Sequence, residues 1–239
     1  MIQFDIDQWR AWAPGLESAD DWSIWAASPG PLATDAEPNV SFLPAMQRRR
    51  LSRLARMAFA VATPLIEGQP AMPLVYASRH GETPRTFAIL SDLARQEALS
   101  PTQFSLSVHN AIIGLWSIQQ HDRSEMTALA ADGDGLEHAV MEAALLLAEG
   151  APAVLLVIAE DQPPAAYQPW ISDVSFPYAV ALLLKPGSNW RLSLEAAADN
   201  NASPTEWPHA LELVRALLAG RSHWQHHWKR RRWNWQQTQ

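Results

Sequence analysis

The sequence has no cysteine among its 239 residues. Without thiols the chain cannot form disulfides, and it cannot offer the thiolate that many covalent acyl-transfer enzymes use as their nucleophile. The absence also fits a reducing compartment. Covalent acyl transfer of this kind would therefore need an activated hydroxyl in place of the thiolate.

Long apolar runs are missing as well. The longest ones, residues 151–159 and 178–184, are far shorter than the roughly 20 residues that a membrane-spanning helix needs. The N-terminal sequence MIQFDIDQW is acidic and lacks the basic and apolar regions of a signal peptide. We therefore expect a soluble, cytoplasmic protein.

Charge is unevenly distributed along the chain. There are 18 basic and 25 acidic residues, yet from residue 221 onward Arg221 and Lys229 to Arg232 are basic and none is acidic. This asymmetry predicts a separate basic-aromatic element in residues 201–239. Its tryptophans and basic side chains could contact an anionic membrane or a partner subunit. The net negative charge of the whole chain and the lack of a nucleic-acid-binding motif disfavour binding to nucleic acid.

The hydrophobic pattern predicts alternating strands and helices around one core, which is a layered α/β fold. A tryptophan-rich segment, residues 7–38, should cover this core, and residues 201–208 should form a hinge. Strands are predicted at 1–6, 74–78, 125–131, 153–159 and 178–185, with a further one at 190–196. Helices are predicted at 8–12, 44–66, 83–97, 110–119, 136–149 and 207–218.

Three consecutive stretches resemble the core of the β-ketoacyl synthases. They are VHNAIIGLWSI at 108–118, TALAADGDG at 127–135, and the helical stretch 136–150. In that family a buried strand ends in a reactive cysteine at a sharp turn, and a helix follows. The family's spacing puts this cysteine at Gly133, and a glycine offers no nucleophile.

The resemblance covers about residues 43–186, which is one half of a duplicated architecture. It implies half of a thiolase-like layered α/β fold over residues 1–200, with an N-terminal covering segment and a C-terminal helical tail. The stretches WRAWAPG at 9–15 and RRRLSRL at 48–54 are similar to truncated relatives of the chain length factor, those of aryl polyene biosynthesis in particular.

The same resemblance implies a non-catalytic subunit in an obligate heterodimer with a full-length ketosynthase. An acyl carrier protein is the expected second partner, and no cofactor or metal is expected. The strand expected to join the two subunits contains Glu125, Met126, Thr127, Ala128, Leu129 and Ala130. The residues expected to face the partner or its acyl pocket are Ser78, Gln103, Phe104, His109, Asn110, Ala111 and Leu115.

Three arginines of the predicted helix 44–66 form a basic stripe: Arg49, Arg53 and Arg56. Such a stripe could dock an acidic carrier protein, or it could be a solvated helix face that bonds nearby carboxylates. Both interpretations remain open at this point.

Two other chemistries are conceivable. Ser107 and His109, with Asp132 or Asp134, could form a hydrolase or acyltransferase site, although no G-x-S-x-G elbow is present. His223, His226 and His227 have the spacing of metal ligands on one helix face, or they are solvated side chains of the tail.

Overall fold

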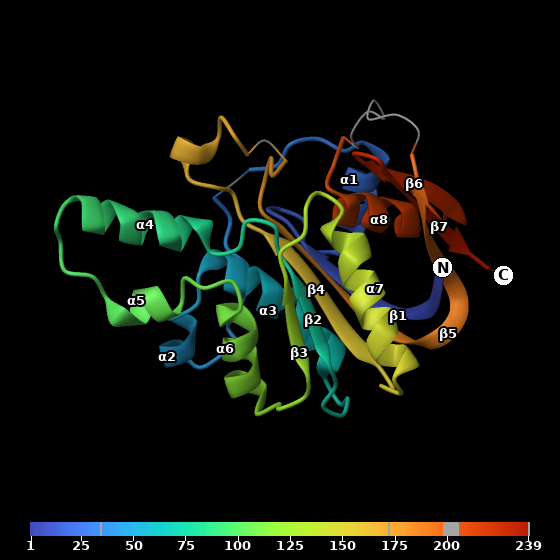
Figure 1. The fold of residues 1–239 in the computed structure, drawn as a ribbon, viewed down its shortest axis with the longest axis horizontal. Helices are drawn as coiled ribbons and strands as arrows, with labels where there is room; N and C mark the ends of the chain where they lie inside the picture. Colours follow the sequence, from blue (N-terminus) through green and yellow to red (C-terminus); the bar gives the residue numbers. More distant parts are fainter. Residues whose placement is uncertain (34, 172, 198–205, 239) are drawn as a thin grey trace.

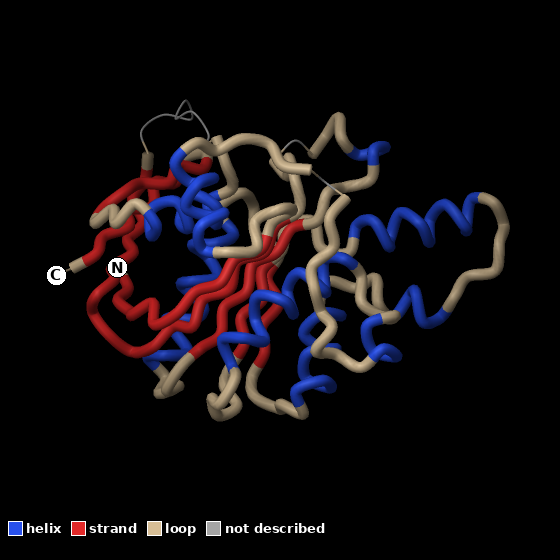
Figure 2. The backbone as a smooth tube through the Cα atoms, turned by 180° about the vertical axis from the view of Figure 1, so that it is seen from behind, coloured by secondary structure: helices blue, strands red, loops and turns tan. Residues whose placement is uncertain are grey.

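A mixed β-sheet runs through the middle of the molecule, with helices on both sides (Figure 2). The computed structural model describes residues 1–33, 35–171, 173–197 and 206–238. The strand order is β3-β2-β4-β5-β7-β6, and β1 pairs with β5. The strands are β1 (Ile2–Trp12), β2 (Leu74–Ala77), β3 (Met126–Leu129), β4 (Val154–Glu160), β5 (Tyr178–Ala196), β6 (His223–Trp228) and β7 (Arg231–Gln237).

The central strands are buried on both faces because each face has its own helical layer. Val154, Leu156 and Ile158 of β4 pack into one core, and the alternate residues of the strand pack into the other. The first core includes side chains of α1 (Ala19–Ala27), α7 (Gly135–Ala148) and α8 (His209–Leu218). The second includes those of α3 (Arg53–Ile66) and α6 (Ala111–Gln120). The layered α/β prediction is confirmed.

Three predicted boundaries are wrong. Residues 8–12 do not form a helix, because β1 continues through them and pairs with β5 as far as Trp12. Residues 44–66 form two helices, α2 (Ala45–Arg48) and α3, because Ser52 is extended and its hydroxyl caps α3 by accepting a hydrogen bond from Ala55 N. The strands predicted at 178–185 and 190–196 are a single strand, β5.

The predicted C-terminal helix is confirmed as α8, but the basic-aromatic run is not helical. It forms the β6–β7 hairpin, and β7 extends the sheet beside β5. Trp224, Trp233 and Trp235 are buried in the first core, so these side chains are not available to a membrane surface. Residues 201–205 of the predicted hinge, with the domain boundary predicted at residue 200, lie outside the described residues.

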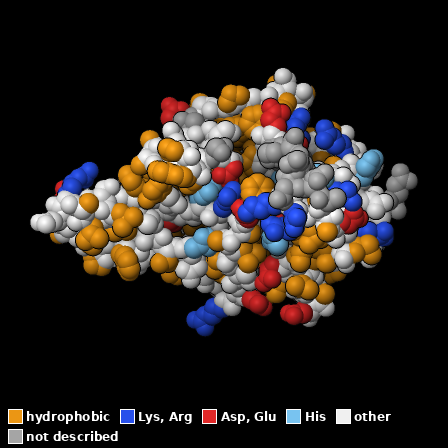
Figure 3. Space-filling model, turned by 45° about the horizontal axis from the view of Figure 1, so that its top comes forward, with side chains coloured by type: hydrophobic (Ala, Val, Ile, Leu, Met, Phe, Trp, Pro, Cys, Tyr) orange, Lys and Arg blue, Asp and Glu red, His pale blue; other side chains and the backbone are white. Residues whose placement is uncertain are grey.

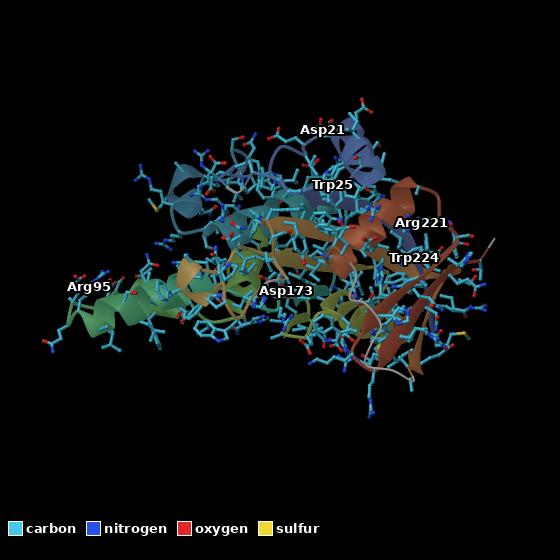
Figure 4. The ribbon with its side chains drawn as sticks, turned by 90° about the horizontal axis from the view of Figure 1, so that it is seen from above. Asp21, Trp25, Arg95, Asp173, Arg221 and Trp224 are labelled. Atoms are coloured by element: carbon cyan, nitrogen blue, oxygen red, sulfur yellow. The ribbon has the colours of Figure 1, made fainter. Side chains whose placement is uncertain are left out.

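A helical arm projects from the body at the end opposite the two termini (Figure 1). It consists of α4 (Thr83–Ala94) and α5 (Pro101–Ser105), and Arg95 lies at its outer end (Figure 4). Hydrophobic side chains gather on this arm (Figure 3), where Leu90, Leu93, Leu99 and Phe104 are exposed. A short 3₁₀ helix, η1 (Ala165–Tyr167), lies in the loop between β4 and β5. Among the described helices, none has the length and apolarity to cross a membrane.

Candidate functional site

The predicted nucleophile turn lies between β3 and α7, as the resemblance implies. Residues 130–133 follow the strand, and α7 begins at Gly135. Asp134 occupies the N-cap position, although its side chain makes no capping hydrogen bond to the helix. In a fold of this kind the turn presents its side chain at the positive end of a helix, where a nucleophile would be activated.

The space above Gly133 is filled by the indole ring of Trp228, the last residue of β6. An ideal Cβ atom on Gly133 would lie 2.3 Å from Trp228 Cζ3 and 2.5 Å from Cε3. Real Cβ atoms do not approach other atoms this closely, so a side chain at position 133 would require the ring to move. The Trp228 ring is in turn flanked by the Arg79 guanidinium, 5.4 Å from its centroid, and by Lys229 Nζ at 5.7 Å.

The two aspartates beside Gly133 hold the hairpin in this place. Asp134 is fully buried and accepts hydrogen bonds from Arg231 Nε at 2.5 Å, Arg231 Nη2 at 2.8 Å and Trp233 Nε1 at 2.9 Å. Asp132 pairs with Lys229 and with Arg79 Nη2 at 3.0 Å. Hydrogen bonding to Asp134 raises the pKa of Arg231. The carboxylates of the turn are thus used to bind the C-terminal hairpin.

A second buried carboxylate lies one turn further along α7. Glu137 accepts hydrogen bonds from His209 Nδ1 at 2.8 Å, His226 Nδ1 at 2.5 Å and Trp235 Nε1 at 3.2 Å. Burial acts to raise the pKa of Glu137, but the two imidazoles hold this pKa below its usual range. Burial lowers the pKa of His226, whereas Glu137 outweighs burial and raises the pKa of His209.

A cavity of about 340 Å³ lies beside the turn. Ser78, Glu160, Asp173, His209 and Trp228 are among its lining residues, and Asp173 lies near the middle of the molecule (Figure 4). The buried Glu160 carboxylate accepts hydrogen bonds from the backbone N–H groups of Arg79 and His80 and from Ser78 Oγ. Burial nevertheless raises the pKa of Glu160 to about 7.

We expect this buried carboxyl group to make the protein less stable as the pH rises from about 4.5 to about 7. In that window the unfolded chain has released the Glu160 proton while the folded chain still holds it. The loss is on the order of 3 kcal/mol, since one pKa unit corresponds to about 1.4 kcal/mol. Glu160→Gln should remove this slope from unfolding curves measured at several pH values.

Other ionisable side chains lie close to Glu160, so its contribution is isolated by comparing the variant with wild type. Arg79, His80, Asp173 and the buried hydroxyls of Tyr76 and Tyr178 face or surround it. The exposed Glu149→Gln is the control variant and should keep the slope. Equal slopes in wild type and Glu160→Gln would show that folding does not raise the pKa of Glu160.

The structure does not bring Ser107 and His109 together as a hydrolytic pair. Ser107 Oγ donates to Phe104 O at 2.8 Å, and His109 Nε2 lies 2.8 Å from the carbonyl oxygen of Ser78. Both side chains are therefore bonded to main-chain carbonyls. A serine without a base in hydrogen-bond reach is not activated, so the hydrolase interpretation gains no support.

The other residues predicted to face the partner lie between the arm and α6. Gln103 and Phe104 are exposed on α5, and Gln103 accepts a hydrogen bond from Arg85. Asn110 precedes α6, Ala111 begins it, and Leu115 packs in part against the second core. Ser78 is buried at the end of β2, where its carbonyl meets His109.

The basic stripe is largely engaged within the chain. Arg53 bonds to Asp161, with Nε at 2.9 Å from the carboxylate, and Arg56 Nη1 lies 3.2 Å from Glu37. Arg49 is exposed. Two of the three arginines thus bond to carboxylates of the same chain, which was one of the two interpretations of the stripe.

The strand predicted to join two subunits lies at the edge of the sheet. Within the described residues, β3 pairs only with β2, and its four side chains are half-buried. Leu74 N donates to Glu125 O at 3.0 Å, and Ser78 N donates to Leu129 O at 3.1 Å. Because successive residues of a strand turn their backbone polar groups to opposite sides, Met126 and Ala128 present theirs to the free edge.

The sequence prediction missed the groups that close the turn: Trp228, Asp134 with Arg231, and Glu137 with two histidines. The suggested metal site on one helix face is wrong, because β6 is a strand in which His223 is exposed and His226 is buried. A signal was present in the sequence. Trp224, His226 and Trp228 are spaced by two residues, which is the period of a strand.

The comparisons with known proteins agree with this architecture. The family described as beta-ketoacyl synthase, N-terminal domain, matches residues 22–236. The chain is also similar to a chain in the structure of the ketosynthase ApeO in complex with its chain length factor ApeC from Xenorhabdus doucetiae. The sequence identity is 32% and the TM-score 0.89, over 99% of this chain and 100% of that chain.

More distant structures show the same fold. The ishigamide ketosynthase/chain length factor has 13% identity and a TM-score of 0.65, over 90% of this chain and 82% of that chain. AntDE:AntF, a type II polyketide synthase acyl-carrier protein in complex with its ketosynthase, has 10% identity and a TM-score of 0.69, over 100% of both chains. No curated protein sequence matches the chain.

Proposed function

We propose that this chain, which belongs to the β-ketoacyl synthase N-terminal domain family, is a non-catalytic subunit that pairs with a full-length ketosynthase. In this role it resembles a chain length factor: the partner supplies the nucleophile, and this chain bounds the partner's acyl pocket. The product class that fits the sequence resemblance is a type II polyketide of the aryl polyene kind.

The observation that carries the proposal is the packed turn at Gly133. A condensing enzyme needs an accessible thiolate there, and the chain has a glycine covered by the Trp228 ring. The carboxylates on either side are occupied by Lys229, Arg79 and Arg231. In this proposal the turn keeps the strand-turn-helix arrangement of the family and serves to hold the C-terminal hairpin.

The similarity to the ApeO–ApeC structure supports the pairing. The alignment spans nearly all of both chains, so the matched chain has about the same length as this one. That structure contains a ketosynthase together with its chain length factor. A shared fold alone does not carry function, but here it coincides with the closed nucleophile turn.

We place the contact with the ketosynthase along β3. A free strand edge is a ready site for pairing with another chain, and within the segment Glu125 to Ala130 the backbone groups of Met126 and Ala128 face this edge. The exposed apolar side chains of the arm would extend this interface. An interface of this kind should exceed roughly 2,000 Å².

Ala128→Pro should weaken the complex, because proline removes the N–H that faces the free edge and keeps the ladder with β2. The loss of one intermolecular hydrogen bond should raise the Kd of the complex with the ketosynthase about tenfold or more. Ala128→Ser retains the N–H and is the matched control. The measurement is co-purification with a tagged ketosynthase, followed by binding isotherms; equal affinity of both variants would exclude β3 from the interface.

The arm and the start of α6 would then face the acyl pocket of the partner. Phe104 is 65% exposed in the isolated chain, which suits a side chain that becomes a wall only after pairing. Gln103, His109 and Ala111 lie beside it on the same segment of chain. We also place the acyl carrier protein as a second partner, with the exposed Arg49 as a candidate contact for its acidic surface.

Phe104→Ala should lengthen the products of the reconstituted pair by at least one unit, because it removes the end wall of the tunnel. Enlarging Ala111 to leucine should shorten them, since overlap with a packed wall costs about 1–3 kcal/mol per inserted group. Product length is read by mass spectrometry with the ketosynthase unchanged. Leu145→Ala, at an exposed leucine on α7, is the control and should change nothing.

A further inference from the structure

Glu137, His209 and His226 form a cluster of potential metal ligands behind the nucleophile turn. They come from three separate elements, α7, α8 and β6. Their side chains are 0%, 3% and 1% exposed, and one ligand atom of each lies within 4.8 Å of the other two. Among the described residues, this is the group whose histidine and acidic atoms converge in this way.

We propose that these three side chains bind a zinc-class divalent metal ion. Two imidazole nitrogens and one carboxylate oxygen are a donor set that Zn²⁺ uses in proteins. Hard cations such as Mg²⁺ prefer oxygen ligands and keep several waters, so this set selects against them. The proposal does not depend on pairing with a ketosynthase.

The geometry of the cluster fits this assignment. His209 Nδ1 and His226 Nδ1 point at the two oxygens of one carboxylate, at 2.8 and 2.5 Å. The two imidazole rings are stacked, with centroids 4.3 Å apart and planes inclined by 28°. When an ion binds, the proton of each Nδ1 moves to Nε2, and the freed Nδ1 lone pairs and the carboxylate oxygen need only small shifts to reach the about 2.0–2.2 Å of zinc–nitrogen and zinc–oxygen bonds.

Hydrogen bonding within the cluster leaves part of each imidazole unsatisfied. Nε2 of His209 and Nε2 of His226 are both buried and have no hydrogen-bond partner in the described part of the chain. Unpaired buried polar atoms are uncommon in folded proteins and call for an explanation, such as a bound ion or water. Each ring thus has a second nitrogen that can carry the proton when Nδ1 binds the ion.

A fourth ligand and a route for the ion are also available. His209 lines the cavity of about 340 Å³ beside Gly133, so water can reach the cluster from that side. Three protein ligands and one water complete a tetrahedral site. Such an ion would join α7, α8 and β6, the elements that position Trp228 over Gly133, and its effect should be on stability.

The test uses the full chain, purified without chelators from zinc-supplemented medium. We expect about one zinc ion per chain by elemental mass spectrometry, as a three-ligand site requires. After chelation, added Zn²⁺ should raise Tm by about 5 °C or more, whereas added Mg²⁺ should leave it unchanged. Co²⁺ should give the visible absorption of a tetrahedral centre.

His226→Ala should abolish the bound zinc and the Tm shift, while His223→Ala, an exposed histidine on the same strand, should keep both. If His226→Ala does not fold, the wild-type titration decides alone. A wild-type chain that purifies without zinc, and whose Tm responds equally to Zn²⁺ and Mg²⁺, overturns the proposal. The cluster would then be a carboxylate hydrogen-bonded to two histidines and nothing more.

Discussion

Asp134→Ala should lower the free energy of unfolding by about 2–4 kcal/mol, the larger of the two effects expected around the turn. The substitution removes the buried acceptor of two Arg231 bonds and leaves the Trp233 indole N–H without a partner. Arg231 is about one-third exposed and can turn to solvent, which keeps the loss below that of a fully buried pair. Urea unfolding of the full chain gives the value.

Asp132→Ala is the matched control two residues away. Asp132 is partly exposed, and its partner Lys229 is largely exposed, so removing it should cost no more than about 1 kcal/mol. Similar losses for the two variants would mean that Asp134 does not anchor the hairpin.

Gly133→Cys should destabilise the chain by about 1–3 kcal/mol and should not produce a condensing enzyme. The new Cβ would overlap the Trp228 ring, which must leave its place beside Arg79 and Lys229. A thiol alone also lacks the groups that stabilise the charge developing during decarboxylation. Thermal unfolding and radiolabelled malonyl condensation measure the two parts of this prediction.

The double variant Gly133→Cys, Trp228→Ala separates overlap from other effects. Removing the ring should restore part of the lost stability, so the two changes should be coupled by about 0.5–3 kcal/mol. Gly133→Ser combined with Trp228→Ala gives a second double-mutant cycle, in which serine replaces cysteine as a side chain of similar volume. Additive losses in both cycles would refute the contact between the Gly133 turn and Trp228.

The parts of the fold that follow from local patterns could be predicted. β4 is apolar from Val154 to Ala159, and α7, which precedes it in the chain, has apolar residues at helical spacing. Both elements and their type were therefore evident from the sequence. Residues 8–12 were not, because only pairing with β5 makes Trp9 to Trp12 extended. Ser52 is an ordinary capping residue, yet the apolar pattern runs across it and hides the break.

The C-terminal hairpin was hidden for a different reason. Its two-residue turn is Lys229-Arg230, and Lys229 has a φ of +53°, a conformation in which glycine or asparagine is the usual signal. Without such a turn signal, the segment from His223 to Trp235 was predicted to belong to a helical tail. The partner of each side chain lies far away in the sequence, on α7, α8 or β5.

The same limit applies to the site. The family resemblance located the turn at Gly133, but nothing local to residues 127–135 indicates what covers it. Trp228 occupies the space because Asp134 holds Arg231 and Trp233 of β7 beside the turn. In this chain the turn at Gly133 is a packing contact with Trp228, and both halves of that contact must be known before the turn can be interpreted.

The most direct test of the proposed role is a condensation assay on the purified complex of this chain with a full-length ketosynthase. The partner's nucleophilic cysteine is replaced by alanine, and this chain is left unchanged. The account predicts that radiolabelled malonyl condensation disappears, while the complex with the intact cysteine remains active. Condensation that persists in the cysteine-free complex would contradict it, because the nucleophile would then have to come from this chain.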